Sequence, residues 1–316
     1  MSFLYFLQDL RNPVTDFIFA TLTHLGEEAI FLLVALLVFW CIDKKHGYYF
    51  LTVSFVGLSI NQFLKLLCRI PRPWVLDPDF PIVESAREAA TGYSFPSGHT
   101  QNAVNTYGSI ARFTRSRALR IGCIAAVVVV AFSRLYLGVH TPKDVLTSLV
   151  IGTALVLVMY PLIRRALEKP ALMYAVIGVL VLLATAFVLY AECYAFPADV
   201  DPVNLAEGRK NAWTILGCAA ATLVVYTVDT YFVRFETSAP LPAQICKLVF
   251  GGGLTVLLKS VLKSPLLSLC ADHPAAHALR YFLMVVFAGA LWPMTFKAFA
   301  KIRIPALDNL FKKREK

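Results

Sequence analysis

The sequence predicts an all-α protein that crosses a membrane many times. Of its 316 residues, 58% are hydrophobic and only 16% are charged, and the mean hydropathy is +0.65. A soluble domain has about 25% charged residues. Apolar runs of a length suited to a bilayer recur along the whole chain. These observations predict a polytopic helical membrane protein with a six-helix core bundle and about four further transmembrane helices.

The first part of the chain, residues 1–165, is predicted to form the core bundle. Residues 1–25 are expected to form an amphipathic or partly inserted helix that is broken at Asn12-Pro13. A loop rich in proline and charge is expected at residues 68–96. The helices that follow the first are expected at residues 29–41, 48–67, 101–113, 121–137 and 145–163.

The helix expected at residues 101–113 is unusually polar. It carries Gln101, Asn102, Asn105 and Thr106 within two turns. Polar side chains at this density are costly against lipid. We therefore expect this helix to be buried among the others.

The second part, residues 166–316, is predicted to be a transmembrane extension whose role the sequence does not indicate. Three consecutive glycines, 251–253, are expected to let a neighbouring helix approach closely. A basic segment, residues 312–316, ends the chain. The four spans of the extension are expected at residues 171–191, 212–228, 246–262 and 279–295.

Charge and cysteine content narrow the possible partners. The net charge is +10, but the cations lie at the ends of apolar runs, so membrane lipids are expected partners and nucleic acid is not. The seven cysteines form no CxxC pair, so neither a metal site nor a cofactor is predicted. Residues 1–11 have no basic segment ahead of their apolar residues, so no cleavable signal peptide is expected. The oligomeric state is not indicated.

The distribution of positive charge predicts a topology. If the turn at Lys44 is cytoplasmic and each later span crosses once, most of the 30 Lys and Arg residues fall on the cytoplasmic side. The C-terminus is then cytoplasmic. Lys65, His99, Arg134 and His140 all fall at the opposite, extracytoplasmic face of what would be the plasma membrane in a bacterium.

The residues that meet there suit the chemistry of phosphate. A phosphoryl group in transfer spreads negative charge over its oxygens, and a catalyst surrounds it with fixed cations and N–H groups. Lys65, Arg72 and Arg134 supply the positive charge. Ser97-Gly98 stands just before a helix, where free N–H groups favour an anion.

Two histidines are candidates for the covalent and proton-transfer steps. Thr141 and Pro142 suit the cap and first position of a helix, so Asp144 falls where its carboxylate can reach back past the cap. Asp144 can then accept a hydrogen bond from one nitrogen of His140 and leave the other nitrogen free to attack. His99 has no carboxylate nearby in sequence, which makes it the candidate acid for the leaving oxygen.

These residues lie in three motifs, in this order: Lys65-x6-Arg72-Pro73, Pro96-Ser97-Gly98-His99 and Ser133-Arg134-x5-His140-x3-Asp144. The arrangement resembles the type-2 phosphatidic acid phosphatase superfamily, which includes vanadium haloperoxidases and glucose-6-phosphatase, over about residues 20–165. The resemblance implies a metal-independent phosphatase with a phosphohistidine intermediate on His140 and with His99 as acid. It implies a phosphate site made of Lys65, Arg72, Ser97, Gly98, His99 and Arg134.

We therefore expect an integral membrane phosphatase for a lipid phosphomonoester or diphosphate. Candidate substrates are phosphatidate, lysophosphatidate, a sphingoid phosphate or a polyprenyl diphosphate. One alternative is a phosphotransferase that passes the same phosphoryl group to a lipid or sugar acceptor. The other is a lipid transporter with a vestigial site, which the complete set of motif residues argues against. A haloperoxidase is disfavoured because those enzymes are soluble.

Overall fold

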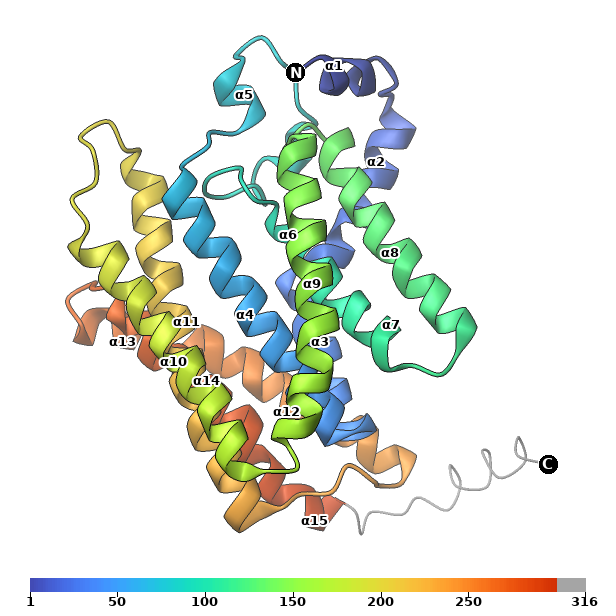
Figure 1. Cartoon of the computed structure of the whole chain (residues 1–316), viewed down its shortest axis with the longest axis vertical. Helices are drawn as coiled ribbons and strands as arrows, with labels where there is room; N and C mark the ends of the chain where they lie inside the picture. Colours follow the sequence, from blue (N-terminus) through green and yellow to red (C-terminus); the bar gives the residue numbers. More distant parts are fainter. Residues whose placement is uncertain (300–316) are drawn as a thin grey trace. The chain divides into compact units, whose positions relative to one another are not determined.

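The computed structural model describes residues 1–299, and these are helical with no strand. The basic segment at residues 312–316 and the predicted cytoplasmic C-terminus lie outside the described residues. The helices, shown in Figure 1, are α1 Ser2–Asp9, α2 Pro13–Leu22, α3 Glu28–Leu37, α4 Lys44–Cys68, α5 Pro73–Leu76, α6 Gly98–Ala103, α7 Ser109–Phe113, α8 Arg117–Tyr136, α9 Pro142–Ala166, α10 Pro170–Cys193, α11 Pro202–Val228, α12 Leu241–Val261, α13 Lys263–Leu269, α14 Ala275–Val286 and α15 Phe296–Phe299.

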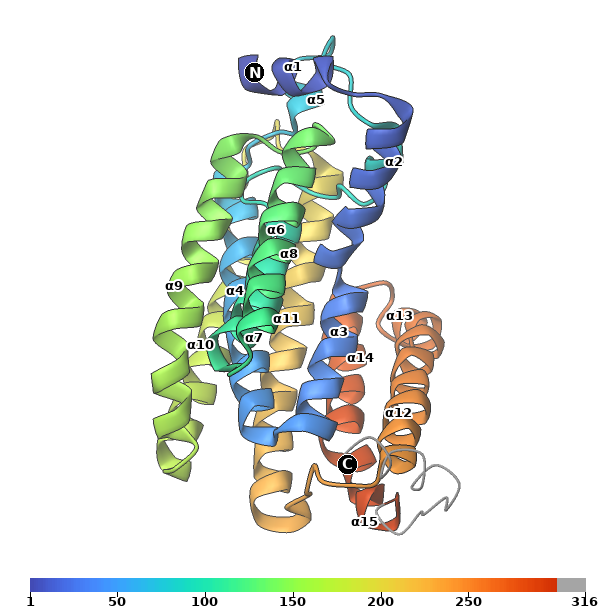
Figure 2. The ribbon, with the colours of Figure 1, turned by 90° about the vertical axis from the view of Figure 1, so that its right-hand side faces the viewer.

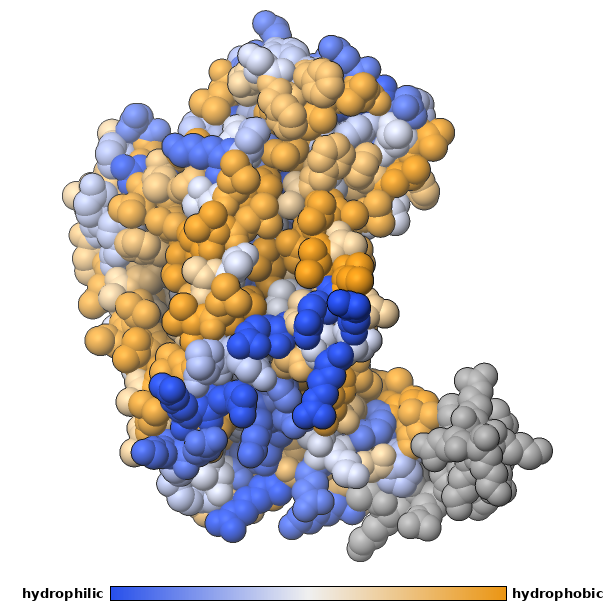
Figure 3. Space-filling view, turned by 45° about the vertical axis from the view of Figure 1, so that its right-hand side comes forward, coloured by the Kyte–Doolittle hydropathy of each residue, from blue (hydrophilic) through white to orange (hydrophobic). Residues whose placement is uncertain are grey.

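Seven helical segments among the described residues are long and apolar enough to span a membrane. An eighth consists of a pair, Pro13–Gly26 and Glu28–Ile42, that bends by 45° at its break. Hydrophobic side chains cover a broad area of the surface in Figure 3. In lipid a segment must satisfy its own backbone hydrogen bonds, which a helix does. The prediction of a polytopic all-α membrane protein is confirmed.

Most predicted helix bounds agree with the structure to within a few residues. The exception is the span predicted to start at residue 212, because its helix, α11, begins ten residues earlier at Pro202. Asp201 caps this start by accepting hydrogen bonds from the N–H groups of residues 203 and 204, at 2.8 and 2.9 Å. The first three turns are too polar to be recognised as part of an apolar span.

The chain forms two compact units, and one of them holds all the motif residues. This unit comprises Met1–Leu32, Tyr49–Arg165 and Leu183–Ala212. Within it α4, α8 and α9 run side by side, and α1 lies across the end where α8 stops and α9 starts (Figures 1 and 2). The predicted domain boundary at residue 165 stays a prediction.

The polar helix of the motif unit is continuous but irregular. It runs through α6, a π-helical turn, η4 (Val104–Gly108), and α7. Gln101 and Asn105 are buried as expected, and the Gln101 amide donates to Asn105 at 3.1 Å. The 3₁₀ turn η1 (Thr23–Gly26) packs against this helix, because Asn102 donates to the carbonyl of Gly26 at 2.8 Å.

The second unit comprises, among the described residues, Leu33–Tyr48, Ala166–Leu182 and residues 213–299. Its buried carboxylate, Asp229, accepts hydrogen bonds from Lys44 at 3.0 Å and from Tyr48 at 2.9 Å. Within it α12 and α14 stand side by side (Figure 2). The close approach expected at glycines 251–253 occurs at Gly251, where an added Cβ would lie 2.1 Å from Nε1 of Trp292.

Candidate active site

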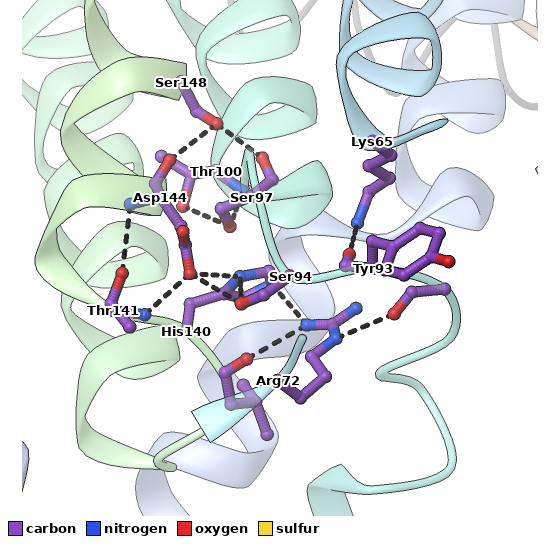
Figure 4. A network of polar contacts seen from close by, with 12 residues as sticks. Lys65, Arg72, Tyr93, Ser94, Ser97, Thr100, His140, Thr141, Asp144 and Ser148 are labelled. Atoms are coloured by element: carbon purple, nitrogen blue, oxygen red, sulfur yellow. Dashed lines mark hydrogen bonds and ion pairs between the residues drawn. The ribbon is translucent and has the colours of Figure 1, made fainter. Parts of the chain in front are cut away.

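His140 lies two residues before α9 begins, with its Nε2 atom facing a guanidinium group. Nε2 is 2.8 Å from the NH1 atom of Arg72, which caps the short helix α5 (Figure 4). A guanidinium has only donors, so Nε2 must accept this hydrogen bond and the ring proton must lie on Nδ1. The structure therefore fixes the tautomer in which Nε2 carries the lone pair.

Asp144 lies on the other side of the imidazole. Its Oδ2 atom is 3.4 Å from Nδ1 of His140 and accepts a 2.8 Å hydrogen bond from the backbone N–H of Thr141. The N–H of Asp144 in turn donates to the Thr141 hydroxyl at 3.4 Å. This is the reciprocal cap predicted from the sequence, and it holds the carboxylate beside Nδ1.

Ser94 completes this side of the site and was not predicted. Its hydroxyl donates to Oδ2 of Asp144 at 2.6 Å and lies 3.4 Å from Nδ1 of His140 (Figure 4). Ser94 and Asp144 are 50 residues apart, and nothing in the local sequence around the serine indicates this contact.

Backbone carbonyls hold the Arg72 guanidinium in place. Its Nε donates to Gly92 at 3.0 Å, its NH2 to Thr91 at 2.7 Å and its NH1 to Val139 at 3.0 Å. These bonds fix the orientation of the guanidinium group without neutralising its charge. Among residues 1–299 no ion pair includes Arg72, Lys65 or Arg134. Three buried cations without carboxylate partners make the site a strong attractor for an anion.

Lys65 and Arg134 are the other two buried cations. Lys65 donates to the carbonyl of Tyr93 (Figure 4). Arg134 is fully buried and donates from NH1 to the hydroxyl of Thr23 at 2.8 Å. Its Nε and NH2 atoms have no hydrogen-bond partner within the described chain. Thr23 was also missed from sequence, because it lies 111 residues before Arg134.

The positive charges act together on His140. Burial lowers the pKa of His140 well below its ordinary value, and the charges of Arg72, Arg134 and Lys65 lower it further. His140 is therefore neutral at pH 7. A neutral, buried imidazole with a defined lone pair has the properties of a nucleophile.

Hydrogen bonds to backbone groups join the Pro96-Ser97-Gly98-His99 motif to α9. Ser97 caps α6 by accepting from the N–H of Thr100 at 3.4 Å, and its own N–H donates to the carbonyl of Asp144 at 3.2 Å. Ser148 donates to the Ser97 carbonyl at 2.8 Å. Gly98 follows as the first residue of α6. These bonds fix where the helix starts relative to α9.

His99 is the second residue of α6. Its Nε2 atom is buried and has no hydrogen-bond partner among residues 1–299. An added Cβ on Gly26 would lie 2.9 Å from the His99 carbonyl, so η1 touches this part of the helix.

Of the predicted site residues, Arg72, His140, Asp144 and Ser97 are linked by direct contacts. Lys65 and Arg134 lower the pKa of His140 through their charge, and His99 follows Gly98 in α6. Within the described residues no three His, Cys, Asp or Glu side chains gather as a possible metal site.

Two family models match the chain. Residues 45–168 match the PAP2 superfamily, and residues 213–303 match the family described as "PAP2 superfamily phosphatase, transmembrane extension". The prediction of a phosphatase of this superfamily with a transmembrane extension is therefore confirmed. No solved structure matches the chain.

The chain is similar to several curated lipid phosphatases. It is 33% identical to an undecaprenyl-diphosphatase of Bacillus subtilis over 146 residues, 45% of this chain and 72% of that protein. It is 29% identical to a probable sphingosine-1-phosphate phosphatase of Dictyostelium discoideum over 48% of this chain and 39% of that protein. It is 25% identical to human sphingosine-1-phosphate phosphatase 2 over 71% of this chain and 54% of that protein. The chain thus spans about half or less of the last two.

Proposed function

The chain belongs to the PAP2 superfamily, and from this premise we propose that it is an integral membrane lipid phosphatase that works through a phosphohistidine on His140. The observation that carries the proposal is the position of His140, between Arg72 at Nε2 and Asp144 with Ser94 at Nδ1. This arrangement supports attack by Nε2, since Nδ1 keeps its proton and a carboxylate stabilises the cation that forms.

In the first half of the reaction Nε2 of His140 attacks phosphorus, and the bond from phosphorus to the lipid oxygen breaks. His99 gives its proton to that oxygen, so the lipid leaves as an alcohol or, from a diphosphate, as a monophosphate. Lys65, Arg72 and Arg134 balance the charge on the phosphoryl oxygens, together with the first N–H groups of the helix at Ser97-Gly98.

In the second half a water molecule replaces the lipid oxygen. His99, now neutral, takes a proton from the water as its oxygen attacks phosphorus. The P–N bond breaks, its electron pair returns to Nε2 of His140, and inorganic phosphate leaves. No metal ion takes part in either half of this reaction.

The proposed substrate is a lipid phosphomonoester or diphosphate at the extracytoplasmic face. The relatives named as lipid phosphatases support a lipid, and the excess of positive charge assigned to the other side supports the face. Residues 1–165 are proposed as the catalytic core, with a cytoplasmic C-terminus after the extension.

The test is phosphate release by the purified protein in detergent with EDTA present. The panel contains phosphatidate, lysophosphatidate, a sphingoid phosphate and a polyprenyl diphosphate. We expect release from at least one of them and none from His140→Ala. Full activity in His140→Ala contradicts the mechanism. A phosphorylated product formed from an added acceptor alcohol, in place of inorganic phosphate, indicates a phosphotransferase instead.

A further inference from the structure

Asn61 is a buried side chain whose position the mechanism above does not explain. It lies in α4 with 1% of its surface exposed, and neither Nδ2 nor Oδ1 has a hydrogen-bond partner within the described part of the chain. The next residue along the helix is different, since the Gln62 amide accepts a hydrogen bond from Asn211 at 3.1 Å. An unpaired amide in a membrane helix is costly, because the polar group loses its water and gains nothing.

Asn61 lies close to two elements of the predicted phosphate site. Asn61 precedes Lys65 by four residues, so both side chains lie on the same face of α4. A Cβ added to Gly98 would have one atom within 4 Å outside its own helix, Oδ1 of Asn61 at 3.8 Å. Asn61 therefore faces Gly98, the first residue of α6, from the same face of α4 that carries Lys65.

Other buried side-chain atoms of the predicted phosphate site also lack a partner within the described part of the chain. They are Nε2 of His99 and the Nε and NH2 atoms of Arg134. A phosphate group in the site has enough oxygens to accept from such donors, and an amide N–H can add to them. Leucine has nearly the same size and would suit the interior of a membrane helix better.

We propose that Asn61 is a substrate-binding residue, whose Nδ2 donates a hydrogen bond to a nonbridging oxygen of the bound phosphate. This inference rests on the proposed phosphatase function and adds a residue outside the three motifs to the phosphate site. The role requires the amide only when phosphate is present. Its removal should therefore harm binding and catalysis but not folding.

The experiment compares the wild type with Asn61→Leu, Asn61→Asp and the neighbouring control Gln62→Leu. Unfolding temperature is measured in detergent with and without inorganic phosphate, and kcat and KM are measured with the best lipid substrate. For Asn61→Leu we expect an unchanged or higher unfolding temperature, a smaller rise on adding phosphate, and a 10- to 100-fold lower kcat/KM. Gln62→Leu should lower the unfolding temperature and leave kcat/KM within about twofold.

Asn61→Asp tests the contact by charge. A carboxylate of the same shape repels the phosphate, so this variant should lose more kcat/KM at neutral pH than Asn61→Leu and recover part of it in acid. Asn61→Leu that keeps wild-type kcat/KM, or that unfolds at lower temperature or fails to fold, overturns the inference. A wild type that releases phosphate from no lipid overturns the proposed function instead. In that case the rise in unfolding temperature on adding phosphate, compared between the wild type and Asn61→Leu, still tests the role of Asn61.

Discussion

NH1 of Arg72 lies 2.8 Å from Nε2 of His140, and this contact determines which ring nitrogen can attack. Since the arginine can only donate, it marks Nε2 as the atom with the lone pair. When phosphate binds, the same N–H is placed to turn to a phosphoryl oxygen. One side chain would thus keep the nucleophile in its reactive tautomer before the substrate arrives and hold the substrate afterwards.

Removing the charge of Arg72 should change the pH dependence of the reaction. Arg72 is one of the causes of the lowered pKa of His140, after burial. A protonated His140 has no lone pair, so activity falls below the pKa, and the acid limb of kcat/KM in the wild type should lie below about pH 6.5. In Arg72→Gln this limb should move to higher pH, on top of weaker binding. Arg87→Gln, which removes an exposed, paired cation from the same loop, should leave the limb in place. An unmoved limb in Arg72→Gln contradicts this assignment.

Loss of the Ser94 hydroxyl should slow the chemical step. It removes the 2.6 Å hydrogen bond to a buried carboxylate. A hydrogen bond to a charged group contributes about 1.5–3 kcal/mol, so kcat of Ser94→Ala should fall about 10- to 100-fold with little change in KM. Steady-state kinetics measure both constants. Ser85→Ala, at an exposed position of the same loop, is the control, and equal kcat values for the two variants would exclude a positioning role for Ser94.

Side-chain size at Gly26 should matter for catalysis. A Cβ there would lie 2.8 Å from Val130 and 2.9 Å from the His99 carbonyl, so η1 and the helix with His99 must separate. Small displacements of catalytic groups cost about 100-fold, and we expect a loss of at least about 10-fold in kcat/KM for Gly26→Ala. Gly122→Ala in α8 meets no atom within 4 Å and should retain full activity. Comparable activity in the two variants would contradict the close packing of η1.

The glycines of α12 should differ in their effect on stability. A Cβ on Gly251 would collide with the Trp292 ring at 2.1 Å, whereas one on Gly253 meets nothing within 4 Å. Overpacking costs about 1–3 kcal/mol, so Gly251→Ala should unfold at lower temperature. Gly253→Ala should be neutral or more stable because alanine favours helix. Thermal unfolding in detergent measures both, and the reverse order would contradict the packing of α12 against this tryptophan.

The sequence predicts the helices of this protein well because a long apolar run that crosses a membrane satisfies its backbone hydrogen bonds by forming a helix. It fails where a helix is polar, as in the first turns of α11, because the pattern used to find spans is hydrophobicity. The break at Asn12-Pro13 could be predicted, since the asparagine caps α2 and the proline takes its first position.

In the candidate site, local contacts could be predicted from the sequence and contacts between distant segments could not. The cap that joins Thr141 to Asp144 is local, and it could be predicted from the spacing. The contacts of Ser94 with Asp144 and of Thr23 with Arg134 depend on how distant segments fold together, and no pattern in the sequence encodes them. Asn61 was missed because it lies outside the three motifs, and only its burial without a partner draws attention to it.

The most direct test of the account is to trap the covalent intermediate. The purified protein is mixed with lipid labelled in its phosphate and denatured in alkali within milliseconds, because a phosphohistidine is stable in base and labile in acid. The account predicts label on a peptide containing His140 in the wild type and none in His140→Ala. Label that persists in His140→Ala, or no label in a wild type that turns over under the same conditions, would contradict it.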